Sequence, residues 1–267
     1  MEKYTPGYSA NATTFMAQRT VDSHAAFFRA YLRPGFHLLD CGCGPGTITL
    51  GFAPLISPGL VTGVDLEASQ IQVARERSVA SGLSNLRFQV SSIYELPFAN
   101  HCFDAAFSHA VMEHLQQPVK ALQELHRVLK PGGVVGLRSP DWGGFLLAPA
   151  SAELEEALAY YKQIQQRNGG DPYIGRQLGA LLRQAGFTNI KVSASYQCYE
   201  NLSLIAEYLA LQIEASDSNE QSNRSKENAG SSRHQSCAEM GNTLRAWSQH
   251  RDSWFAQAWC EAVAYKA

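Results

Sequence analysis

A regular alternation of short apolar runs and helical patterns between residues 36 and 138 most constrains the fold of this chain. Five apolar runs have the length of buried strands, at residues 36–41, 60–65, 86–90, 103–108 and 134–138. Segments with helical periodicity lie between them, at residues 47–55, 68–81 and 119–129. Strands that alternate with helices of about 10–15 residues are typical of βαβ units. The pattern therefore predicts an α/β fold with a parallel sheet.

The segments outside this alternation predict an arm before the sheet and further helices after it. Residues 1–35 predict a helical arm, which Pro34-Gly35 ends. Beyond residue 139, helices are predicted at 151–168, 174–185 and 202–213, and strands at 190–196 and 262–265. Residues 216–236 consist mainly of Ser, Asn and charged residues, with Ala229 as the one clear hydrophobic residue. We expect a mobile loop there.

A glycine-rich turn between the first strand and the first helix is the strongest sign of a binding site. Gly42, Gly44 and Gly46 would let the backbone approach a ligand closely. Asp65 ends the second strand about 20 residues later, where a carboxylate can accept hydrogen bonds from ribose hydroxyls. The spacing G-x-G-x-G, with Pro45 inside it, differs from the G-x-G-x-x-G of dinucleotide sites. It therefore suits a nucleoside without a pyrophosphate.

Further motifs follow this turn in a fixed order. They are Leu-Asp-Cys-Gly-Cys-Gly-Pro-Gly-Thr (39–47), Gly-Val-Asp-Leu (63–66), Glu-Leu-Pro-Phe (95–98), Phe-Asp-Ala-Ala-Phe-Ser-His (103–109) and Arg-Val-Leu-Lys-Pro-Gly-Gly (127–133). With them the chain resembles the class I S-adenosylmethionine-dependent methyltransferases of the UbiE/type-11 group. The resemblance implies a Rossmann-like, seven-stranded, mostly parallel sheet with helices on both faces. The core would then span 36–198 and end with a last strand at 262–267, after an arm at 1–35 and a helical insertion at 199–261.

The resemblance also implies a site for S-adenosylmethionine, whose product is S-adenosylhomocysteine. The backbone around Gly42, Cys43 and Gly44 would contact the methionine part of the cofactor. Asp65 would bind the ribose, and Leu66 would pack on the adenine ring.

Other residues would complete this cofactor site. Ser92 stands where many relatives have an Asp that receives the adenine amino group, and a hydroxyl can accept the same hydrogen bond without charge. The backbone N–H of Ile93 would meet an adenine ring nitrogen, and His109 would lie beside the methionine end. Arg19 in the arm would pair with the cofactor carboxylate. The arm would also supply lid residues, Tyr8 and Phe15, although an ordinary helix surface is the alternative for all three arm residues.

Methyl transfer sets modest chemical demands. The displacement occurs in line at a sulfonium methyl and the leaving group departs neutral, so the protein must mainly align the acceptor and exclude water. A base is needed only if the acceptor must lose a proton. Candidates are His109, His114 and Asp141, with Glu113 beside them, and a structural role is the alternative for each. The catalytic residue therefore stays unassigned at this point.

Aromatic residues in the segments that would cover the site favour a small apolar or aromatic acceptor. They are Trp142, Phe145, Tyr160, Tyr161, Tyr173, Trp247, Trp254, Phe255 and Trp259. A net charge of −2 and the lack of a basic stripe argue against nucleic acid. Two other classes remain open: a protein that binds the cofactor without turnover, and a nicotinamide-dependent oxidoreductase, which the glycine spacing disfavours.

The remaining composition predicts a cytoplasmic protein without a metal site. The sequence has no stretch near the roughly 20 apolar residues of a membrane span, and its first residues lack the apolar region of a secretory signal. Cys41 and Cys43 lack metal-ligand spacing, so we expect no metal and reduced thiols. The sequence sets no expectation for the oligomeric state.

Overall fold

A seven-stranded sheet forms the centre of the computed structural model, which describes residues 4–8, 10–220 and 235–267. The strands lie in the order β3-β2-β1-β4-β5-β7-β6. Their bounds are β1 His37–Cys41, β2 Leu60–Asp65, β3 Leu86–Val90, β4 Phe103–His109, β5 Leu129–Ala148, β6 Thr188–Cys198 and β7 Trp254–Tyr265. Strand β7 runs antiparallel to both of its neighbours, and the other neighbouring strands are parallel. The predicted α/β class with a mostly parallel sheet is therefore confirmed.

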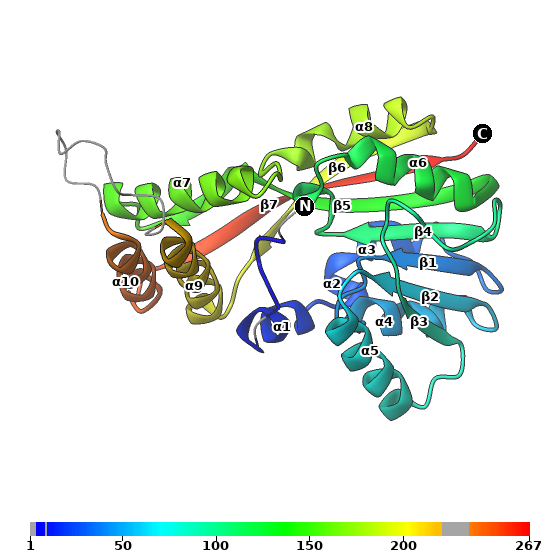
Figure 1. Cartoon of the computed structure of the whole chain (residues 1–267), viewed down its shortest axis with the longest axis horizontal. Helices are drawn as coiled ribbons and strands as arrows, with labels where there is room; N and C mark the ends of the chain where they lie inside the picture. The colour runs from blue at the N-terminus through cyan, green and yellow to red at the C-terminus, as the bar shows by residue number, and fades with distance from the viewer. Residues whose placement is uncertain (1–3, 9, 221–234) are drawn as a thin grey trace.

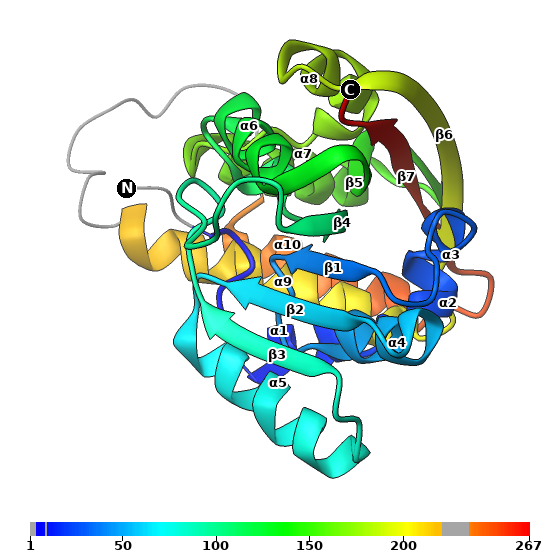
Figure 2. The same cartoon turned by 90° about the vertical axis from the view of Figure 1, so that its right-hand side faces the viewer.

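Helices cover both faces of the sheet (Figure 2). On one face, α4 (Thr47–Ile56) and α5 (Ala68–Ser81) pack with the short helices α2 (Val21–His24) and α3 (Ala26–Arg29). On the other face lie α6 (Pro118–Val128) and α8 (Leu178–Gln184). Successive strand residues point to opposite faces, so Leu38 belongs to the first of these cores and Leu39 to the second.

The strand order reverses between β1 and β4. The chain runs from β1 to β2 and β3 on one side, and then returns to place β4 on the other side of β1. Connections that leave adjacent strands in opposite directions open a crevice at the carboxyl ends of the strands, where ligands of such sheets bind. The glycine-rich turn follows β1 at this point, and His109 ends β4 beside it.

Strands β5, β7 and β6 extend beyond the other strands of the sheet, and β5 and β7 carry a separate hydrophobic core there (Figure 1). Helices α7 (Ala152–Arg167), α9 (Leu202–Glu220) and α10 (Cys237–Ser248) pack around this extension together with α1 (Ala10–Ala17). We call the four helices, with residues 139–148 and 254–259, the outer lobe.

Strands β5 and β7 extend furthest beyond their predicted bounds. The sequence predicts the fifth strand only over 134–138, since the hydrophobic pattern changes beyond residue 139. Hydrogen bonding between β4 and β5 ends at Arg138. Beyond it one side of β5 has no neighbouring strand, so Pro140, which lacks a backbone N–H, is tolerated there. Gly143 and Gly144 fall in a register shift between Asp141 and Leu146, which lets the strand continue past a bulge. Strand β7 likewise begins at Trp254 rather than at residue 262, because it pairs with this extension.

Three helical predictions also differ in detail. The predicted arm contains three short helices instead of one. Thr20 interrupts the helical segment and begins α2, because its side chain accepts a hydrogen bond from the backbone N–H of Ser23 (3.2 Å). The segment predicted as one helix at 174–185 divides into a 3-10 turn, η2 (Ile174–Gln177), and α8. The expected loop at 216–236 overlaps α9, which continues to Glu220, and its last residue, Ser236, caps α10. Residues 221–234 lie outside the described residues.

Within the described ranges, no helix is both long and apolar enough to cross a membrane.

Candidate active site

The glycine-rich turn after β1 adopts a backbone that side chains would not tolerate. Gly42, Gly44 and Gly46 have φ values of +76°, +51° and +80°. A Cβ atom on Gly42 would lie 2.2 Å from Val111 Cγ2, so packing alone requires a glycine there. A Cβ atom on Gly44 would meet no atom of the described chain within 4 Å, because this residue faces a cavity. The turn therefore leaves room for a ligand at Gly44.

Asp65 anchors the other side of this turn. Its Oδ2 accepts a hydrogen bond from the backbone N–H of Gly44 (2.9 Å), and its Oδ1 accepts one from Glu67 (3.0 Å). Burial raises the pKa of this carboxyl, whereas the two backbone donors lower it. Each carboxylate oxygen can accept a second hydrogen bond. Asp65 can therefore bind two ribose hydroxyls while it holds the turn in place.

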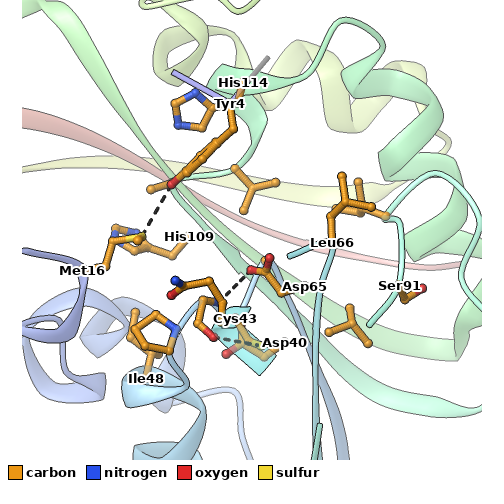
Figure 3. A pocket seen from close by; sticks show the side chains of 18 of the residues that line it. Tyr4, Met16, Asp40, Cys43, Ile48, Asp65, Leu66, Ser91, His109 and His114 are labelled. Atoms are coloured by element: carbon orange, nitrogen blue, oxygen red, sulfur yellow. Dashed lines mark hydrogen bonds between the residues drawn. The ribbon is translucent and has the colours of Figure 1, made fainter. Parts of the chain in front are cut away.

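A cavity of about 180 Å³ lies beyond the carboxyl ends of β1, β2 and β4, and we call it the first cavity. It brings together ten of the predicted cofactor residues: Tyr8, Arg19, Gly42, Cys43, Gly44, Asp65, Leu66, Ser92, Ile93 and His109. Figure 3 shows Tyr4 and His114 at one end of this cavity and Asp40 at the other. Residues that the sequence had not indicated also line it, among them Tyr4, Met16, Asp40, Gln70 and Val111.

The residues predicted for the adenine ring lie together at the mouth of the first cavity. Leu66 is 69% exposed and lines the cavity, so its side chain is free to pack against an adenine ring. Ser92 Oγ accepts a hydrogen bond from the backbone of Tyr94 (3.2 Å), which leaves it one further lone pair. Its hydroxyl can thus still accept a hydrogen bond from an amino group.

Asp40 is a buried acid that sequence reasoning did not assign to the site. Its Oδ2 accepts a short hydrogen bond from Thr49 Oγ1 (2.6 Å), and burial raises its pKa to about 7. Its position directly before the glycine-rich turn was the signal that could have identified it. The residue lines the first cavity and ties β1 to α4.

A second cavity of about 40 Å³ lies between the first cavity and the outer lobe. The two cavities share Tyr4, Arg19, Ala110 and His114 as common walls. The other lining residues of the second cavity are Pro6, Phe15, Glu113, Pro140, Trp142, Tyr161, Gln165, Tyr199, Ile205, Tyr208, Gln257 and Trp259. Its walls are thus largely aromatic.

Phe15 and the predicted aromatic residues are divided between this cavity and the core of the outer lobe. Phe15, expected beside the cofactor, lines the second cavity instead and stacks on Tyr208 at 4.6 Å between ring centres. Three of the predicted acceptor-side aromatics line the second cavity, namely Trp142, Tyr161 and Trp259. Four others pack into the core of the outer lobe: Phe145, Tyr160, Trp247 and Phe255. Tyr173 lies against Arg176, and Trp254 is largely exposed.

The two histidine candidates are buried and neutral. His109 lies between His24 and Trp259, at 5.0 and 4.8 Å between ring centres, and burial lowers its pKa well below the usual value. Burial together with the charge of Arg19 lowers the pKa of His114 to about 3. Such weakly basic imidazoles are poor proton acceptors near neutral pH.

Asp141 has a structural environment. Its two oxygens accept hydrogen bonds from Arg176, at 2.5 and 2.7 Å, and one of them also accepts from the backbone of Gly143 (2.8 Å). It belongs to the lining of neither cavity. The arrangement stabilises the bulge of β5 and occupies both carboxylate oxygens of Asp141.

Glu113 is the buried acid that faces the second cavity. It lies in the short helix η1 (Met112–His114). The backbone carbonyl of Glu113 accepts hydrogen bonds from Gln165 Nε2 (3.0 Å) and from the backbone N–H of Asp171 (2.9 Å), and these two bonds hold the helix in position. The residue is 2% exposed, and burial raises the pKa of its side chain to about 7. Its Oε1 lies 3.8 Å from His114 Nε2.

The N-terminal segment, residues 4–8, crosses over both cavities. Tyr4 stacks on Tyr8 and meets the ring of His114 edge-on at 4.7 Å. Thr5 Oγ1 accepts a hydrogen bond from Asn168 Nδ2 (3.0 Å), and the carbonyl of Pro6 accepts one from Gln212 Nε2 (2.8 Å). The segment is thus attached to the outer lobe while it covers the junction of the cavities.

Comparison with known proteins agrees with this geometry. A family model described as a methyltransferase domain matches residues 32–195. An uncharacterized methyltransferase of Schizosaccharomyces pombe is 34% identical over 204 residues, 73% of each chain. The probable methyltransferase ltbC of Aspergillus luteorubrus is 29% identical over 98% of this chain and 97% of its own.

A solved structure extends the likeness to the fold. Phosphoethanolamine N-methyltransferase 2 of Haemonchus contortus, solved with S-adenosylhomocysteine, superposes with a TM-score of 0.56 at 21% identity, over 88% of this chain and 49% of that one. At this level of identity the match supports the fold alone. The family model, the extent of the first relative and the glycine-rich turn with Asp65 place the chain among the class I S-adenosylmethionine-dependent methyltransferases.

Proposed function

We propose that this enzyme transfers the methyl group of S-adenosylmethionine from the first cavity to a small, apolar or aromatic molecule in the second. The main support for this proposal is that the two cavities share four lining residues, Tyr4, Arg19, Ala110 and His114. A donor and an acceptor held on either side of this junction would face each other directly. In-line displacement requires that alignment.

Residues of the first cavity suit the parts of the cofactor. Asp65 would hold the ribose hydroxyls, and the backbone from Gly42 to Gly44 would lie along the methionine part. Arg19 makes no ion pair with any carboxylate in the described part of the chain, so its guanidinium is available to the cofactor carboxylate. Three residues at the mouth would surround the adenine: Leu66, Ser92 and Ile93.

The chain's own contribution to the reaction is mainly alignment and the exclusion of water. The cofactor supplies an electrophilic methyl group on a positively charged sulfur. His109, buried and neutral, would form an uncharged wall beside it. Ala110 follows with φ +55°, an unusual conformation for a residue with a side chain, and donates its N–H to the carbonyl of Arg138 (2.9 Å). This fixed backbone holds the junction between the cavities in shape.

The N-terminal segment would act as a lid. At about 40 Å³, the second cavity has room for only one or a few water molecules while residues 4–8 cover it. An acceptor would enter when the hydrogen bonds from Asn168 and Gln212 open. Reclosure would then exclude water from the reacting atoms. The largely aromatic walls and the net charge of −2 favour a small molecule over nucleic acid as the acceptor.

Calorimetric titration with S-adenosylhomocysteine tests the cofactor assignment. Asp65→Ala should weaken binding about ten- to a hundredfold, because hydrogen bonds to a charged group contribute about 1.5–3 kcal/mol. Asp104→Ala is the matched control, since that carboxylate binds Lys130 and the backbone of His37 away from the cavities. Equal affinities of the Asp65 and Asp104 variants, or no binding by the unmodified chain, would contradict the assignment.

A further inference from the structure

Three buried oxygen atoms of the second cavity lack hydrogen-bond partners. They are Glu113 Oε2, Gln165 Oε1 and Gln257 Oε1, and none makes a hydrogen bond within residues 4–8, 10–220 and 235–267. The hydroxyl of Ser139, which is also unpaired, is the nearby donor that lowers the pKa of Glu113. The three residues are 2%, 1% and 1% exposed. Two further unpaired atoms belong to residues that line this cavity, the donor Trp259 Nε1 and the ring nitrogen His114 Nδ1. Buried polar atoms are nearly always paired in folded proteins, and oxygen acceptors are the majority here, so the cavity fits a ligand that brings mainly donors.

The orientation of both amide groups is fixed by their neighbours. Gln165 Nε2 donates to the carbonyl of Glu113 (3.0 Å). Gln257 Nε2 donates to the carbonyls of Asp141 (3.1 Å) and Ala258 (3.0 Å). Because a carbonyl oxygen only accepts, the nitrogen of each amide must point at it. The amide oxygens are therefore the atoms left for the ligand, and they come from α7 and β7, with Glu113 from η1.

The rest of the lining defines the body of that ligand. The aromatic rings of Phe15, Trp142, Tyr161, Tyr199, Tyr208 and Trp259 supply flat apolar walls. Arg19 also lines the cavity, and its positive charge acts on Glu113, His114 and the nearby tyrosines. A cationic amine would be repelled by this guanidinium. A carboxylate could pair with Arg19, but it would bring only lone pairs to the three acceptor oxygens.

We propose, on the basis of the proposed function, that the acceptor is a small aromatic molecule with at least two hydroxyl groups, one of which is methylated on oxygen with Glu113 as its proton acceptor. The hydroxyl oxygen forms a bond to the methyl carbon, and its proton passes to Glu113 Oε2. The carbon–sulfur bond breaks with its electron pair on sulfur, which becomes neutral as the carboxylate becomes a carboxylic acid. The amide oxygens of Gln165 and Gln257 accept hydrogen bonds from the remaining hydroxyl groups.

The electrostatics of Glu113 agree with this role. Burial raises the pKa of its carboxyl to about 7, which matches a base that works near neutral pH. The neighbouring His114 stays neutral and does not compete for the proton.

Small aromatic probes test the proposal with the 267-residue chain and S-adenosylmethionine. Catechol and 1,2-dihydroxynaphthalene should yield monomethyl ethers by mass spectrometry, phenol should react more weakly, and benzylamine should stay unmodified. Methylation of benzylamine in preference to catechol would overturn the proposal, as would the absence of an ether from both dihydroxylated probes. If S-adenosylhomocysteine still binds in either case, the assignment of the cofactor site stands and only the acceptor class is wrong.

Two variants test the named residues. Glu113→Gln should lower kcat for catechol about a hundredfold or more and leave the affinity for S-adenosylhomocysteine unchanged. Gln165→Leu should raise the KM for catechol about tenfold with little effect on phenol, which has no second hydroxyl to bind.

A matched control separates recognition from structural damage. Gln197→Leu removes another glutamine side chain, but Gln197 lies outside both cavities and its loss should leave the KM for catechol unchanged. A purely structural role of Gln165 would change the KM for phenol and catechol by the same factor, and that result would refute its contact with the second hydroxyl. Retention of full kcat in Glu113→Gln would refute the role of Glu113.

Discussion

Replacement of Gly42 by alanine tests whether packing, and not only the ligand, requires the glycine-rich turn. The residue has φ +76°, and the new Cβ would lie 2.2 Å from Val111 Cγ2. The left-handed backbone costs a residue with a side chain about 1–2 kcal/mol, and overpacking costs about 1–3 kcal/mol more. Gly42→Ala should therefore lower the free energy of unfolding by about 2–5 kcal/mol. That loss is a large part of the roughly 5–15 kcal/mol that stabilises an ordinary domain.

Gly44→Ala is the matched control for this prediction. Gly44 also has a positive φ, +51°, but its Cβ would meet no described atom within 4 Å. This variant should lose only the backbone contribution of about 1–2 kcal/mol, while its methyl group enters the first cavity and weakens binding of S-adenosylhomocysteine. Urea unfolding, followed by tryptophan fluorescence and circular dichroism, measures the stabilities, and calorimetry measures the affinities.

A double variant isolates the clash. Val111→Ala removes the Cγ2 atom that an alanine at position 42 would strike, so Gly42→Ala should cost less in that background than in the unmodified chain. The reasoning is refuted if the two glycine variants lose equal stability, or if Val111→Ala recovers nothing.

Three further predictions concern buried charges. Because burial raises the pKa of Asp40 to about 7 from 3.8, the folded state keeps a proton that the unfolded chain releases, so this residue makes folding progressively less favourable as pH rises from 3.8 to about 7, above which its effect is constant. Asp40→Asn should therefore gain about 2 kcal/mol of stability relative to the unmodified chain between about pH 5.5 and pH 8, measured by urea unfolding; a pH-independent difference would contradict this. Asp141→Asn should lower Tm by about 2–4 °C in calorimetry, since Arg176 loses its charged partner, and should leave the pH profile of methyl transfer unchanged. Lys266→Ala should lower the free energy of unfolding by about 1–3 kcal/mol, because Lys266 Nζ donates to the carbonyls of His126 (2.6 Å) and Leu129 (2.8 Å), and unchanged denaturation would show that these bonds contribute nothing.

The core of the sheet could be predicted from the sequence because its signals are local. The strand at 60–65, the helix at 68–81 and the strand at 86–90 have the predicted bounds. Each is bounded by nearby glycines, prolines or polar residues, and each keeps its own hydrophobic period. The turn at Gly42–Gly46 and the acid Asp65 are equally local, so the sequence also indicated the position of the first cavity.

The second cavity could not be predicted in the same way. Glu113, Gln165 and Gln257 come from three elements that are far apart in the sequence, and contacts such as that between Gln165 and the carbonyl of Glu113 bring them together. A buried glutamine with one paired and one unpaired amide atom has no sequence signature. The length of β5 could not be predicted for a related reason. Strand β5 can continue through Pro140 because β4 no longer pairs with it there, and the sequence does not show where the pairing of two strands ends.

The outer lobe has its own hydrophobic core, separate from the two cores of the sheet. The family model ends at residue 195, before α9, which supplies Ile205 and Tyr208 to the second cavity. Substitutions in separate cores tend to act independently. A lineage with this architecture can therefore exchange one methyl acceptor for another through changes in α9, while selection for the methyl donor acts mainly on residues of the first cavity, of which only Tyr4, Arg19, Ala110 and His114 also line the second. The range of methyl acceptors can thus evolve through changes in the outer lobe.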